Sequence, residues 1–118
     1  MSEQLRDTDI RLHVGLDAQN VPISLQWEAS DSPHKGKKDC KAFMLSIWDV
    51  NESAALRIDL WTKKMMVDDM NDFFFQTFMT MADTYERATT HKHIAEDIRV
   101  FSKSFKKKME EEMKKNQL

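Results

Sequence analysis

The chain of 118 residues has few of the residues that bend, interrupt or crosslink a fold. It contains two glycines, two prolines and one cysteine, Cys40. A single cysteine excludes an intramolecular disulfide and a zinc site built from several thiolates. So little glycine and proline leaves almost no material for a flexible linker. We therefore expect a single domain over residues 1–118, with frayed ends at residues 1–8 and 110–118.

Strong net charge and long apolar runs are also missing. The formal net charge is -2 at pH 7, whereas nucleic-acid binding relies on clustered Lys and Arg that neutralise phosphates. No apolar run approaches the ~20 residues that a membrane-spanning helix needs. The first ten residues, MSEQLRDTDI, lack the basic and apolar regions of a signal peptide. We expect no nucleic-acid binding, no membrane insertion and a cytoplasmic location.

Three segments alternate between apolar and polar residues, which is the pattern of half-buried strands. IRLHVGL (10–16) and VPISLQW (21–27) are separated by DAQN, a polar segment that tolerates a turn. Together they predict an antiparallel hairpin. LRIDL (56–60) alternates in the same way and predicts a third strand.

Three other segments have apolar residues at helical spacing. The first contains Cys40, Phe43, Met44, Ile47 and Trp48. The second is a wide apolar arc from residue 67 to 88, with Asp68 and Asp69 in its first turn, where carboxylates interact favourably with the helix dipole. The third follows the break at ATTHK and covers residues 94–113. The predicted fold is α+β, with a three-stranded antiparallel sheet packed on one face by three helices, in the order ββαβαα.

No group of residues forms a strong catalytic or cofactor motif. His91 and His93 lie next to Glu96 and Asp97, and a spacing of four puts His93 and Asp97 on one helix face. Two such groups could ligate a metal, yet a catalytic zinc site generally has three protein ligands, and the third would have to come from the first loop, as Asp31, His34 or Cys40. A polar helix start with solvated histidines is the simpler interpretation. Cys40 lies in an apolar stripe, which is more typical of a small core residue than of a nucleophile. We expect no enzymatic activity and no cofactor.

The polar face of the predicted sheet is a candidate docking surface. Arg57, Asp59 and Trp61 share this face if the aliphatic residues of their strand point inward. Trp and Arg are frequent at binding hot spots, so a Trp beside charges is a reasonable anchor. An equally good interpretation is that Trp61 covers the start of the following helix. Trp27 and Glu28 are expected nearby, on the paired strand or at its end.

Three segments resemble the gliding motility protein GldC family. They are ISLQWEASD (23–31), LSIWD (45–49) and LRIDLWTKKMMVDDMNDFFFQTFMTMADTYERAT (56–89). The resemblance extends from about residue 10 to 105, is densest over residues 45–89, and includes Arg57–Thr62. It implies a small, soluble, cytoplasmic protein of the Bacteroidetes that is accessory to gliding motility. It implies no activity, no cofactor and no catalytic residue.

The residues and the resemblance leave three functional hypotheses. The first is a non-enzymatic adaptor that binds a protein of the gliding apparatus through Arg57, Asp59, Trp61, Trp27 and Glu28. The alternative is a self-assembling homodimeric structural protein, joined through its last helix or a sheet edge. An enzyme using the histidines and Cys40 is the weakest hypothesis.

Overall fold

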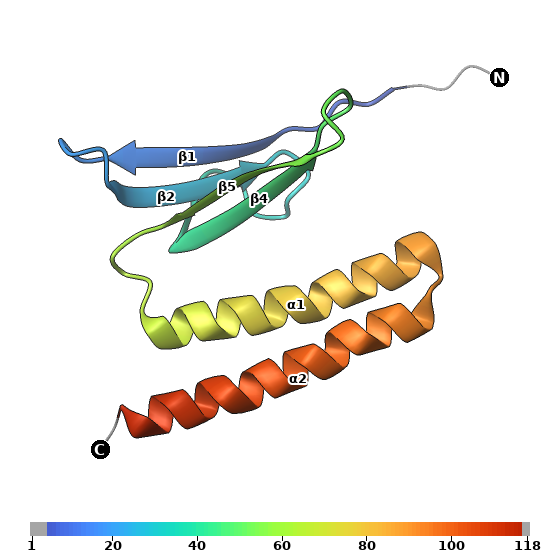
Figure 1. Ribbon diagram of the computed structural model, residues 1–118. Helices are drawn as coiled ribbons and strands as arrows, with labels where there is room; N and C mark the ends of the chain where they lie inside the picture. The colour runs from blue at the N-terminus through green and yellow to red at the C-terminus, as the bar shows by residue number, and fades with distance from the viewer. Residues whose placement is uncertain (1–4, 117–118) are drawn as a thin grey trace. The chain divides into compact units, whose positions relative to one another are not determined.

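The computed structural model describes residues 5–116, and these form an α+β fold (Figure 1). The strands are β1 (Ile10–Leu16), β2 (Pro22–Ala29), β3 (Lys38–Cys40), β4 (Ala42–Trp48) and β5 (Ala55–Trp61), and the helices are α1 (Val67–Thr89) and α2 (Lys92–Lys115). The chain divides into two compact units: a strand unit, which ends at Met65, and a helix unit, which begins at Met66.

β1, β2 and β3 form an antiparallel sheet in that order. The predicted hairpin is confirmed as β1–β2, and its turn is closed by Asp17, whose side chain accepts hydrogen bonds from the N–H groups of Gln19 and Val21 at 2.8 and 3.0 Å. Asn20 takes the left-handed conformation that this turn requires, with φ of 62°. Pro22 begins β2, where its missing N–H removes no bond from the middle of the strand.

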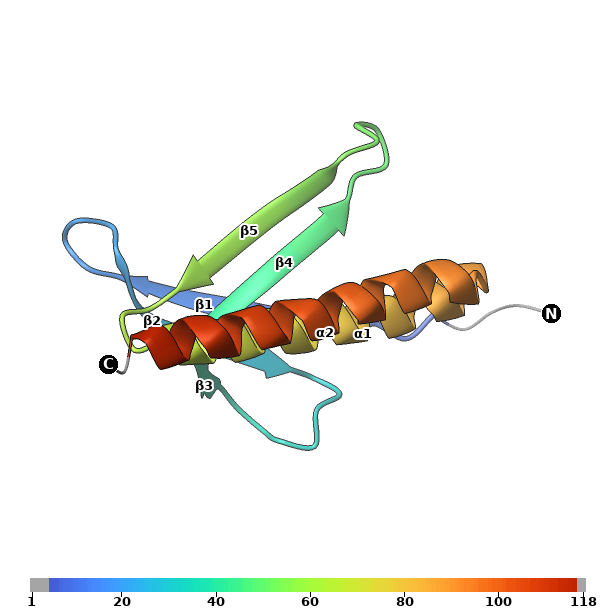
Figure 2. The ribbon, with the colours of Figure 1, turned by 60° about the horizontal axis from the view of Figure 1, so that its bottom comes forward.

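β4 and β5 form a second antiparallel sheet of two strands, seen side by side in Figure 2. A single residue, Lys41, separates β3 from β4, so one bent segment connects the two sheets. The carbonyl of Lys41 accepts a hydrogen bond of 2.9 Å from the backbone N–H of Thr62, immediately after β5. This hydrogen bond therefore holds the end of β5 against the bend at Lys41.

The predicted helix over residues 40–48 is wrong. These residues belong to β3 and β4, so the order is five strands and then two helices, in place of ββαβαα. The predicted single three-stranded sheet with three helices is replaced by two sheets and two helices in residues 5–116. A short apolar run fits both the helical and the strand period. Here Phe43, Leu45 and Ile47 face apolar residues of β5, and this distant pairing decides the outcome.

The helix unit is an antiparallel pair in which α1 and α2 lie side by side (Figure 1). Phe78 of α1 makes edge-to-face ring contacts with Phe101 and Phe105 of α2, at centroid distances of 5.5 and 5.3 Å. Ala82 and Ala95 are completely buried. Both long helices confirm the sequence prediction, and α2 extends to Lys115. The predicted frayed ends lie partly outside the described residues, at 1–4 and 117–118.

Candidate docking surface

The two-stranded sheet has two chemically different faces, because residues that pair across antiparallel strands point to the same side. One face is apolar throughout: Phe43, Leu45, Ile47, Leu56, Ile58 and Leu60. The other face, called the Trp48–Trp61 face below, consists of Ala42, Met44, Ser46, Trp48, Ala55, Arg57, Asp59 and Trp61. Three of the predicted docking residues, Arg57, Asp59 and Trp61, thus lie together on one face of β5.

The two tryptophans of this face are strongly exposed. Trp48 is 69% exposed and Trp61 is 57% exposed. In the register of the sheet Trp48 pairs with Ala55 at one end of the face, and Trp61 pairs with Ala42 at the other end. Each ring therefore has only a methyl group as its direct cross-strand neighbour. Two large aromatic side chains that are not used to fill a core are available as contacts for another surface.

Arg57 and Asp59 form a two-point ion pair between the tryptophans. The Arg57 Nη2 and Nε atoms donate to the two carboxylate oxygens of Asp59, at 2.8 and 3.2 Å. Asp59, through this hydrogen bond and its charge, raises the pKa of Arg57 above its usual value. Both side chains stay substantially exposed, so the pair adds little to folding stability. Its effect is to hold both charged groups in a defined orientation on the face.

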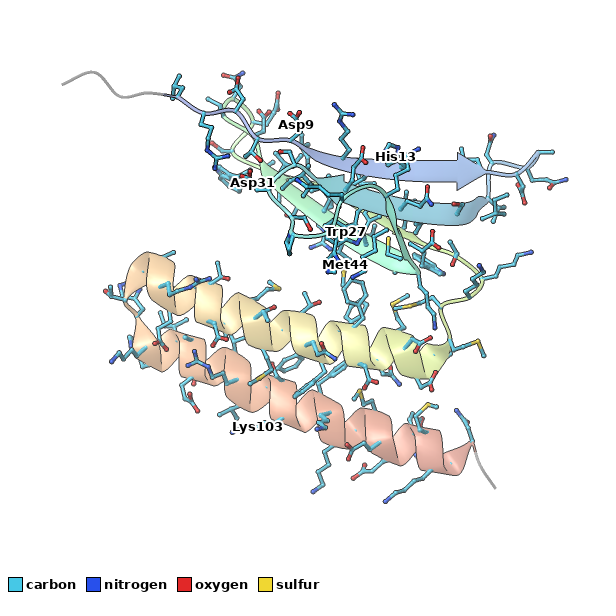
Figure 3. The ribbon with its side chains drawn as sticks, turned by 180° about the vertical axis from the view of Figure 1, so that it is seen from behind. Asp9, His13, Trp27, Asp31, Met44 and Lys103 are labelled. Carbon is cyan, nitrogen blue, oxygen red and sulfur yellow. The ribbon has the colours of Figure 1, made fainter. Side chains whose placement is uncertain are left out.

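Trp27 and Glu28 lie on the three-stranded sheet and not on the sheet that contains β5. Their strand, β2, pairs with β1 and β3, whereas the strand that pairs with β5 is β4. Trp27 faces Leu12 on the apolar side of the three-stranded sheet. Glu28 points to the opposite side, where its carboxylate lies 3.4 Å from the ring of His13. Figure 3 shows the side chains of His13 and Trp27 on opposite sides of this sheet.

The sequence does not predict Trp48 on this face, because the predicted helix over residues 40–48 contains it. Phe43, Leu45 and Ile47 recur at the two-residue spacing of a strand, but Met44 and Trp48 are apolar too, so the spacing alone does not separate a strand from a helix. The aromatic and β-branched residues of the segment favour a strand. With that assignment, Trp48 would have been expected on the face opposite the three apolar residues.

The other candidates for chemistry do not converge. Cys40 lies in β3 opposite Leu25, and burial, followed by the negative charge of Asp39, raises the pKa of its thiol. A raised pKa disfavours the reactive thiolate. Within residues 5–116 no three or more His, Cys, Asp or Glu side chains are grouped so that they could hold a metal ion. Over the same residues, neither helix has the length and apolar character to cross a membrane.

Comparison with known proteins gives one match. A family described as gliding motility-associated protein GldC-like matches residues 22–111, which include every strand from β2 onward and most of both helices. No curated protein and no solved structure matches the chain.

Proposed function

The chain belongs to the GldC-like family of gliding motility-associated proteins, and on this premise we propose that it acts as a cytoplasmic, non-enzymatic adaptor of the gliding apparatus. The adaptor binds a protein partner through the Trp48–Trp61 face. The observation that carries the proposal is the pair of exposed tryptophans on either side of the Arg57–Asp59 ion pair.

Aromatic side chains of this kind supply most of the binding energy in many protein interfaces. A tryptophan buries roughly 200 Å² when it enters a complementary pocket, and truncation of a hot-spot tryptophan commonly costs about 2 kcal/mol or more. Trp48 and Trp61 also have few rotatable bonds, so little conformational entropy is lost when a partner orders them. Both properties suit an anchor.

The ion pair supplies orientation rather than affinity. Arg57 and Asp59 present one charge of each sign on the same face, held by two hydrogen bonds. A partner with the reverse arrangement of charges is favoured, and one with like charges opposite is rejected. Since the pair is already formed, its side chains need no further ordering on binding.

Replacing both tryptophans tests the proposal. We expect Trp48→Ser with Trp61→Ser to reduce capture of the partner from lysate of the native host by roughly a thousandfold, because two losses of about 2 kcal/mol each total about 4 kcal/mol. Bound proteins are measured by quantitative mass spectrometry on immobilised chain. The same variant should fail to restore colony spreading in a strain that lacks the gene.

Val50→Ser is the matched control, because Val50 is an apolar residue that is 92% exposed and lies outside the sheet, in the β4–β5 connection. It should retain both capture and spreading. Circular dichroism must show that the double variant is folded like wild type. If the folded double variant captured the same proteins at the same level, this face would not be the docking surface.

A further inference from the structure

β5 is a strand at the edge of its sheet, since β4 is its only partner in the described part of the chain. Two backbone hydrogen bonds of the β4–β5 hairpin run from the Thr62 N–H to the Lys41 carbonyl and from the Asp49 N–H to the Ala54 carbonyl. The backbone groups of residues 54 and 62 therefore point toward β4. Because these positions alternate along an antiparallel strand, the N–H and C=O groups of residues 55, 57, 59 and 61 point outward, away from β4. These groups are a template for pairing with another strand.

The sequence of β5 is complementary to itself in one antiparallel register. With a two-fold axis through Ile58, Arg57 of one copy faces Asp59 of the second copy, and the same pair is repeated on the other side of the axis. Leu56 faces Leu60 of the second copy in this register. Every outward-pointing backbone position then meets another outward-pointing position. Across this interface apolar side chains face apolar side chains, and each charged side chain faces one of opposite charge.

We propose that two copies of this chain join through their β5 strands, antiparallel and centred on Ile58. The proposal does not depend on which protein the Trp48–Trp61 face binds. β5 carries no lysine, proline or bulge, which are the usual means by which an edge strand resists such pairing. Arg57 and Asp59 disfavour pairing with a strand whose charges do not match theirs, but they attract the charges of a second copy of β5.

β1 is the comparable edge of the three-stranded sheet, and it is less suited to the same role. Pairing β1 with itself over its full length places His13 opposite His13 of the second copy, and Arg11 opposite Gly15. No pair of opposite charges forms in that register. The charge pattern therefore selects β5.

Pairing through β5 also enlarges the docking surface. The two hairpins become one four-stranded sheet in which the Trp48–Trp61 faces are continuous. Ala55 then lies between Trp48 of its own copy and Trp61 of the second copy, and this arrangement occurs twice. The partner of the adaptor thus meets two clefts with tryptophan walls and an alanine floor, on either side of a network of two arginines and two aspartates.

A cysteine at the two-fold axis tests the register. Ile58 faces its own copy at a position without cross-strand hydrogen bonds, where Cα atoms lie about 4.5 Å apart, within the range for a disulfide. In a Cys40→Ala background, Ile58→Cys should form a covalent dimer under mild oxidation, measured by non-reducing electrophoresis. Leu56→Cys is the control on the same strand and face. In the proposed dimer its two cysteines, one from each chain, lie about 13 Å apart. Equal crosslinking of both variants, or of neither, would overturn the proposal.

Charge reversal provides a second arm, which does not use a cysteine. Arg57→Asp alone and Asp59→Arg alone place like charges opposite each other, and each should weaken self-association roughly tenfold or more. Mixed together, the two variants regain opposite charges across the interface and should form a heterodimer, measured by analytical ultracentrifugation. The combined variant, with both changes in one chain, should dimerise like wild type. If the mixture of the two variants were as dissociated as each variant alone, the proposed pairing would be refuted.

Discussion

Residues 57–62 combine exposed and buried positions within a single short segment. Trp61 is exposed, whereas the next residue, Thr62, is only 3% exposed. The N–H of Thr62 donates to the carbonyl of Lys41 at 2.9 Å, and its hydroxyl approaches the same oxygen at 3.4 Å. Thr62 therefore fixes the end of β5 to the bend between the sheets.

Thr62→Val should lower the free energy of unfolding by about 1 kcal/mol, because the valine has nearly the same shape but lacks the hydroxyl donor. The backbone bond to Lys41 stays, so the loss is modest. Urea unfolding followed by tryptophan fluorescence measures the change. Thr80→Val, at an exposed position of α1, should leave stability almost unchanged. A stability loss as large for Thr80 as for Thr62 would argue against this role of the buried hydroxyl.

At the scale of the elements, the helix pair depends on a small aromatic cluster and on close packing of small residues. Phe78 contacts Phe74 within α1 and the two phenylalanines of α2. Ala82 and Ala95 are fully buried, which allows the helix backbones to approach closely. Arg99 of α2 adds ion pairs to Asp83 and Glu86 of α1, at 2.8 and 3.0 Å. Apolar contacts and charged contacts thus connect the same two helices.

Phe78→Ala should lower the free energy of unfolding by about 3 kcal/mol, since it removes the ring that contacts both helices and leaves a cavity. Phe74→Ala is the matched control, because Phe74 is 37% exposed and, within residues 5–116, its ring contacts only the ring of Phe78. It should cost about 1 kcal/mol. Thermal unfolding monitored at 222 nm compares the two. Equal losses would show that Phe78 is not the centre of the helix contact.

At the scale of the whole molecule, self-association links stability to protein concentration. If two folded chains pair through β5 and unfolded chains do not, the melting temperature must rise with concentration. We expect this rise for wild type in differential scanning calorimetry. The Arg57→Asp variant, which loses the complementary charges, should melt at a temperature that depends much less on concentration. A wild-type melting temperature that is the same at all concentrations would contradict the dimer.

Several features could be predicted from the sequence because their determinants are local. The alternation in residues 10–16 and 21–27, with the polar turn between them, predicts the β1–β2 hairpin. The long apolar arcs after Val67 predict both helices, with Asp68 and Asp69 in the first turn of α1. The alternation in LRIDL, continued by one residue, places Arg57, Asp59 and Trp61 on one face. The family was also identifiable from the residues alone, and the match over residues 22–111 confirms it.

Only the tertiary structure decided the conformation of residues 40–48 and the partner of β5. In the short run from Cys40 to Trp48, apolar residues fit a helix and a strand equally, and local periodicity does not choose between them. Strand pairing chooses, because Phe43, Leu45 and Ile47 gain apolar neighbours from residues distant in sequence. The same pairing puts Trp48 on the Trp48–Trp61 face and leaves Trp27 and Glu28 on another sheet. Periodicity within a segment shows which residues share a face, but contacts between segments determine which faces meet.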